Sequence, residues 1–145
     1  MKRIALVICL AGLSPMLWAG GIPTGTWVRR ANKDGMSSTM RVEAAGASQK
    51  ITLTFKVGDS GTSTMICTTQ WDGQDAPVYI DGKLSGETMA LRMVDDRHLT
   101  AIMKMAGKPF ATQKSEVSAD GKVIKTETIP ETAGAQTTIE YWDKK

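Results

Sequence analysis

The chain has 145 residues, of which 41% are hydrophobic and 23% are charged, and its formal net charge is +3. Basic residues are spread along the chain and interleaved with acidic ones, so the clustered basic face of a nucleic-acid-binding protein is missing. A chain of this length can bury one core without disulfides or metals. We therefore expect one domain that does not bind nucleic acid.

Residues 1–19 have the layout of a cleavable secretory signal. Lys2 and Arg3 precede an apolar run over residues 4–13, and the segment ends with small and aromatic residues before Gly20. Cleavage there would remove two basic residues and no acidic residue, which lowers the charge from +3 to +1. We predict a signal peptide at 1–19 and an exported protein, either periplasmic or secreted.

Neither a membrane span nor a disulfide is expected. The apolar run is shorter than the roughly 20 residues that cross a bilayer, and no later stretch approaches that length. Cys9 follows Ile8, where a lipoprotein signal requires a small residue, so no lipid anchor is expected. Cys67 would be the one cysteine of the mature chain. Its thiol is either a small buried hydrophobe, the preferred interpretation, or a reactive group.

Short turn signals divide residues 20–145 at nearly even spacing, typical of successive short strands. Glycine supplies the positive φ of tight hairpins, and Asp tolerates it. The signals are Asp34-Gly35, Ala45-Gly46, Asp59-Ser60-Gly61, Asp72-Gly73, Asp81-Gly82, Ser85-Gly86, Asp95-Asp96, Ala106-Gly107, Asp120-Gly121 and Ala133-Gly134.

Between the turns, apolar and polar side chains alternate with the period of a half-buried strand. The predicted inward sets, in chain order, are Met40, Val42 and Ala44; Ile51, Leu53 and Phe55; Met65, Cys67, Thr69 and Trp71; Met89, Leu91 and Met93; Leu99, Ala101, Met103 and Met105; Ala111, Gln113, Ser115 and Val117; Ile124, Thr126 and Thr128; Ile139 and Tyr141. Eight to ten antiparallel strands result, and almost no room is left for helices.

A sheet of that many strands favours closure. An open meander leaves two edges that invite aggregation, whereas a barrel leaves none. Local connections suit an up-and-down order better than the long crossovers of a Greek key. The prediction is an all-β antiparallel meander barrel over residues 20–145, with a two-sheet sandwich as the alternative.

The segment Gly25-Thr26-Trp27 matches the G-x-W start of lipocalins. Together with WDGQDAPVYIDG at 71–82, ETMALRMVDDRHLTAIMKMAGK at 87–108, VSADGK at 117–122 and the terminal Tyr141, it resembles small exported bacterial proteins with a lipocalin-like domain, a group largely of unassigned function. The resemblance implies a lipocalin-like barrel over the mature chain. Fatty-acid-binding relatives carry a two-helix lid between the first two strands, for which this chain has no room.

Two motifs imitate functional sites. Gly58-Asp59-Ser60-Gly61 copies the tetrapeptide around a serine-protease nucleophile, but the single histidine, His98, follows it, and a hairpin turn explains the tetrapeptide. Asp72, Asp75 and Asp81 lack the spacing of a calcium loop, and His98 has no second ligand at zinc spacing. We predict no enzyme, no cofactor and no metal.

The methionines on the inward faces can fill a core or line an adaptable pocket. Gln113 and Ser115 favour the pocket, because polar groups sealed in an apolar core need partners, whereas a ligand cavity uses a few of them. The first hypothesis is a non-enzymatic extracytoplasmic protein that holds a small apolar or amphipathic ligand. Its candidate walls are Leu53, Phe55, Met65, Trp71, Leu91, Met93, Met103, Gln113 and Tyr141.

The alternative is a packed barrel that binds another protein through its outer surface, as an inhibitor or envelope component. Ile66, Ile102, Phe110 and Trp142, on the predicted outer faces, would then form an exposed apolar patch. The two hypotheses differ in whether the lumen is hollow or filled.

Overall fold

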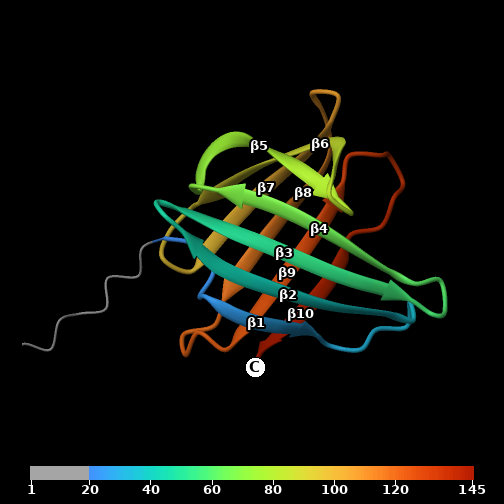
Figure 1. Ribbon diagram of the computed structural model, residues 1–145, viewed down its shortest axis with the longest axis horizontal. Coiled ribbons are helices and arrows are strands. Elements are labelled where there is room, and N and C mark those ends of the chain that lie inside the picture. Colours follow the sequence, from blue (N-terminus) through green and yellow to red (C-terminus); the bar gives the residue numbers. More distant parts are fainter. Residues whose placement is uncertain (1–19) are drawn as a thin grey trace, which may run out of the picture.

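The computed structural model describes residues 20–145, which form ten antiparallel strands in a closed barrel (Figure 1). The predicted signal peptide at 1–19 lies outside the described residues. The strands are β1 (Gly25–Arg29), β2 (Met36–Ala45), β3 (Ser48–Val57), β4 (Thr62–Thr69), β5 (Asp72–Ile80), β6 (Lys83–Met93), β7 (His98–Met105), β8 (Lys108–Val117), β9 (Val123–Pro130) and β10 (Thr138–Lys144). Over residues 20–145 there is no helix, and hence none long and apolar enough to cross a membrane.

Every strand pairs with its neighbours in the sequence, and β1 closes the ring against β10. The closing pairs include Trp27 with Lys144 and Arg29 with Trp142. No strand of the ring keeps a free edge, which removes the template for edge-to-edge aggregation. The predicted all-β meander barrel is therefore confirmed, and the sandwich alternative is wrong.

The turn signals locate most of the hairpins, but two of them lie inside strands. Asp72-Gly73 belongs to β5 and Ser85-Gly86 to β6, where the pairing of these two strands shifts register. Pro77, which has no N–H to donate, stands at the start of the second shift. The connection from β4 to β5 instead turns at Gln70 and Trp71, and Trp71 adopts a φ of 58°. A left-handed backbone at a bulky residue is uncommon, so composition gave no signal for this turn.

Alternating strand directions sort the connections to two ends of the barrel. We call the rim the end that holds the β1–β2, β3–β4, β5–β6, β7–β8 and β9–β10 connections, and the base the opposite end. The base also receives residues 20–24, which lead into β1 (Figure 1). The position of a residue along its strand therefore shows whether it lies nearer the rim or nearer the base.

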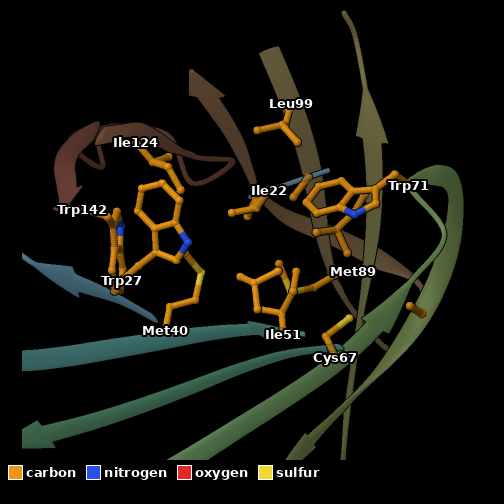
Figure 2. Packing of buried hydrophobic residues seen from close by; sticks show 14 of the residues in the cluster. Ile22, Trp27, Met40, Ile51, Cys67, Trp71, Met89, Leu99, Ile124 and Trp142 are labelled. Carbon is orange, nitrogen blue, oxygen red and sulfur yellow. The ribbon is translucent and has the colours of Figure 1, made fainter. Parts of the chain in front are cut away.

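The inward side chains form one hydrophobic cluster (Figure 2). Trp27 is 0% exposed, and its indole Nε1 donates a hydrogen bond of 3.0 Å to the Pro23 carbonyl. Strand register places Met40 opposite Trp27 on β2, and Ile124 opposite Trp142 on β9. Together these residues pack on the β1, β2, β9 and β10 side of the lumen, and Met40, Ile124 and Trp142 also line the cavity described below.

The face predicted for β10 is wrong. Trp142 is buried and Glu140 is half-buried, whereas Ile139 and Tyr141 are exposed on the outer surface. The Arg30 guanidinium lies 5.1 Å from the centre of the Tyr141 ring. Both faces of this short strand mix polar and aromatic residues, so alternation could not choose between them. Packing of Trp142 inside the barrel decides the orientation.

Candidate ligand cavity

A cavity of about 200 Å³ lies inside the barrel and is partly open to solvent. Most of its wall is apolar and comes from two pairs of neighbouring strands, β3 with β4 and β6 with β7, together with Ile22, Trp71, Met40, Ile124 and Trp142. The wall residues on these two pairs of strands are Ile51, Leu53, Met65, Cys67, Met89, Leu91, Leu99, Ala101 and Met103. The alternation that made these strands recognisable also aims these side chains at the lumen.

Six of the nine predicted wall residues line this cavity: Leu53, Met65, Trp71, Leu91, Met103 and Gln113. Phe55 and Met93 do not, although they lie on strands that line it. Phe55 lies near the rim end of β3, and Met93 lies at the base end of β6, where it packs against the core. Tyr141 faces outward and is 38% exposed. The strands are longer than the cavity, so the correct face alone does not bring a residue to it.

A polar stripe runs up the opposite wall on β8, β9 and β10. Ser115 and Thr126 are register partners whose hydroxyls lie 2.9 Å apart. Two register pairs nearer the rim, Gln113 Nε2 donates a hydrogen bond of 3.2 Å to the Thr128 hydroxyl. Thr126 is also the register partner of Glu140 on β10. The amphipathic lining predicted from Gln113 and Ser115 thus has a structural counterpart across three strands.

A buried arginine on β1 lies next to the β10 end of this stripe. The Arg29 side chain is 4% exposed, and its Nη1 donates a 2.6 Å hydrogen bond to Glu140 Oε1. Nη2 donates to both oxygens of Asp34 and to the Met36 carbonyl. Burial opposes the charge of Arg29, but the hydrogen bonds to Glu140 and Asp34 outweigh it and raise the pKa of the guanidinium. Arg29 therefore stays charged inside the barrel.

Sequence reasoning missed Arg29 and Glu140. The one available signal was parity: Arg29 stands two residues after Trp27, which places both side chains on the same face of β1. Glu140 stands two residues before Trp142, which had been predicted on the outer surface. An inward charge pair joining the two strands that close the barrel becomes visible only when the strands are paired.

At the base of the cavity, the Gln49 side chain forms hydrogen bonds with the backbone of the segment before β1. Gln49, at the start of β3, accepts a 3.1 Å hydrogen bond from the Ile22 N–H and donates one of 2.8 Å to the Ile22 carbonyl. Ile22 itself lines the cavity. Gly21, at a φ of 130°, has no room for a side chain against Gln49 and Trp71. The segment before β1 is therefore held across the base as a floor.

Cys67 lies in the apolar wall and is 2% exposed. Desolvation by burial raises the pKa of the thiol to about 11. The thiolate is the nucleophilic form, so this cysteine is a poor nucleophile at neutral pH. Its surroundings match the preferred interpretation of a small buried hydrophobe.

The serine and histidine of the protease-like motif are separated by the topology. Ser60 lies in the β3–β4 connection at the rim, whereas His98 opens β7 at the base. His98 Nδ1 lies 2.8 Å from Asp95 Oδ1 in an exposed turn. Among the described residues, no three His, Cys, Asp or Glu side chains gather as a metal site would require.

Comparison of the chain with protein-family models, with curated proteins and with solved structures finds no match.

Proposed function

We propose that this chain is an exported, non-enzymatic, lipocalin-like binding protein that holds one small amphipathic molecule inside its barrel. The observation that supports it is the cavity of about 200 Å³, with a mostly apolar wall that carries a polar stripe across β8, β9 and β10. Ligand sites in proteins combine these two features, because apolar walls supply affinity and a few polar groups fix orientation.

The size of the cavity limits the ligand. Drug-sized pockets occupy roughly 300–1,000 Å³, whereas an apolar cavity of about 150 Å³ accepts benzene. A molecule somewhat larger than benzene suits the present volume. Met65, Met89 and Met103 line it with flexible thioethers, which adapt to different apolar shapes. A long fatty acyl chain would need more space than this cavity provides.

Native mass spectrometry of protein purified from its own host tests the proposal. We expect a bound small molecule at one copy per chain. Met103→Trp should fill the cavity and abolish this extra mass, because Met103 lines the wall. Met105→Trp is the matched control, since Met105 lies two residues further on the same strand but is 44% exposed at the rim. An apo mass for the wild-type protein, with no binding from a lipid and metabolite library, would contradict the proposal.

A second candidate function, binding of a protein partner, is supported by large apolar side chains on the outer surface of β5 to β8. Ile102 is 39% exposed and Phe110 is 36% exposed. Ile66 is only half-buried, and Trp142 faces the cavity, so two of the four side chains expected in the patch do not strengthen it. If this function holds, Ile102→Ser with Phe110→Ser should abolish co-purification of one specific protein without changing cavity binding.

A further inference from the structure

Building on the proposed function, we infer that the ligand carries a protonated amine, which binds Glu140 at the β10 end of the polar stripe. The apolar body of the ligand then extends toward Met65, Met103 and Leu91. The cavity selects a cationic amphiphile over a neutral one and excludes an anionic one.

The charged group that the barrel presents to the cavity is a carboxylate, that of Glu140. Among the described residues that line the cavity, Glu140 is the one with a carboxylic or basic side chain. Its Oε1 accepts the hydrogen bond from Arg29, whereas Oε2 accepts none within residues 20–145. The side chain is 25% exposed, so a ligand can reach the carboxylate. A second pocket, at the rim beside Arg30 and Asn32, is also lined by Glu140, so this residue borders both the cavity and the rim pocket.

Arg29 does not cancel this negative charge, because it serves two carboxylates. Its Nη2 lies 2.8 Å from Asp34 Oδ1, and its Nη1 lies 2.6 Å from Glu140 Oε1. The pKa of Asp34 is lowered, first by the Met36 backbone N–H and then by Arg29, so Asp34 remains ionised at neutral pH. One positive and two negative groups leave the cluster with a net charge of −1.

An anionic head group would find no free charged donor among the described residues that line the cavity. Both terminal nitrogens of Arg29 are already engaged, and its Nε is sealed from solvent without a partner among the described residues. A ligand carboxylate placed against Glu140 would face repulsion between like charges, which the poorly solvated lumen would strengthen.

The rest of the stripe is rich in acceptors. Glu140, Thr126 and Ser115 are consecutive register partners across β10, β9 and β8, so they form one row on the wall. The Ser115 and Thr126 hydroxyls share one hydrogen bond and keep further lone pairs. Gln113, two register pairs nearer the rim, uses its amide nitrogen on Thr128 and leaves its carbonyl oxygen unpaired within the described chain. An ammonium group has three donors and no acceptor, which complements this wall.

Three compounds with one skeleton test the inference: phenylpropylamine, phenylpropanol and phenylpropionate. Each is titrated into the full-length mature protein while Trp71 and Trp142 fluorescence is recorded, because both indoles line the cavity. The amine should bind about tenfold more tightly than the alcohol, since a charge-assisted hydrogen bond is roughly twice as strong as a neutral one. The carboxylate should bind most weakly.

Glu140→Gln keeps an acceptor for Arg29 but removes the charge. We expect amine affinity to fall about tenfold and alcohol affinity to stay within about threefold. Glu43→Gln makes the same change on the outer surface, where Glu43 pairs with Arg41, and should alter neither affinity. The comparison of the three compounds on the wild-type protein tests the inference without any variant. It therefore still applies if Glu140→Gln does not fold.

The outcomes separate the inference from the proposed function. Equal binding of the three compounds, or tightest binding of phenylpropionate, would overturn the amine and leave the binding protein intact. If none of the three compounds binds, the inference of an amine ligand is also refuted. Native mass spectrometry then shows whether the protein carries any small molecule. A co-purified cargo without an amine would preserve the proposed function, whereas an apo protein would refute both.

Discussion

Trp71 Nε1 donates a 2.8 Å hydrogen bond to Gln49 Oε1, the same oxygen that accepts the Ile22 N–H. One side chain at the start of β3 therefore ties together the floor segment before β1 and the connection from β4 to β5. Three parts of the chain that are distant in sequence close the base of the cavity through a single amide group.

Gln49→Leu should destabilise the barrel by about 2 kcal/mol, because it leaves the Ile22 N–H, the Ile22 carbonyl and the Trp71 indole without their partner. Urea unfolding followed by tryptophan fluorescence measures this change. Gln74→Leu is the control: Gln74 is exposed on β5, so its replacement should change stability by less than about 0.5 kcal/mol. Equal effects of the two substitutions would show that the hydrogen bonds of Gln49 contribute nothing to the free energy of unfolding.

Ala106→Asn should stabilise the fold by about 0.5–1 kcal/mol, because Ala106 has a φ of 48° and asparagine tolerates this left-handed conformation better. The β9–β10 turn offers a matched control with the same dipeptide. In Ala133-Gly134 only the glycine has a positive φ, so Ala133→Asn should bring no gain. Thermal unfolding of both variants measures the difference, and a gain at Ala133 alone would contradict the backbone argument.

Cys67 should react with iodoacetamide at about pH 8 at least 100-fold more slowly than an exposed thiol, because burial raises its pKa from 9.0 to about 11 and thus removes the thiolate. The measurement uses a Cys9→Ser chain, so that Cys67 is the single thiol. Thr68→Cys in a chain lacking both native cysteines is the control, since the neighbouring Thr68 points outward and is exposed. Similar rates at the two positions would mean that the cavity admits the reagent freely.

Asp95 should stabilise the protein at neutral pH and lose this effect in acid. Its pKa is lowered, first by the Arg97 backbone N–H and then by the His98 side chain. Stability from a lowered carboxyl pKa is complete above the unfolded value of about 4 and disappears as pH falls through the folded value. Asp95→Asn should therefore be less stable than wild type at about pH 7, and the difference should shrink below about pH 4.

Urea unfolding at both pH values measures the effect of Asp95→Asn. Asp96→Asn provides the control in the same connection, where no hydrogen bond to the Asp96 carboxylate is seen within residues 20–145. A stability difference for Asp95→Asn that is constant with pH would show that the carboxylate charge is irrelevant.

Part of the cavity was predictable because alternation is a local property. Leu53, Met65, Leu91 and Met103 lie on long strands whose two faces differ clearly in polarity, so the sequence assigns them to the lumen. Trp71 also reaches the cavity, but by another route: β4 ends at Thr69, and the indole enters from a left-handed turn. The prediction that Trp71 lines the cavity is therefore met, but Trp71 lies in the β4–β5 connection and not on the strand that alternation assigns to it.

What the sequence by itself determined was the strand pattern, most of the turns and the inward face of the long strands, because each depends on residues within a few positions of one another. Closure of β1 on β10, the heights of Phe55 and Met93 relative to the cavity, and the inward placing of Glu140 were decided only by the tertiary structure. Burying Arg29 is tolerable only where Asp34 and Glu140 meet it, and Glu140 lies 111 positions away in the chain.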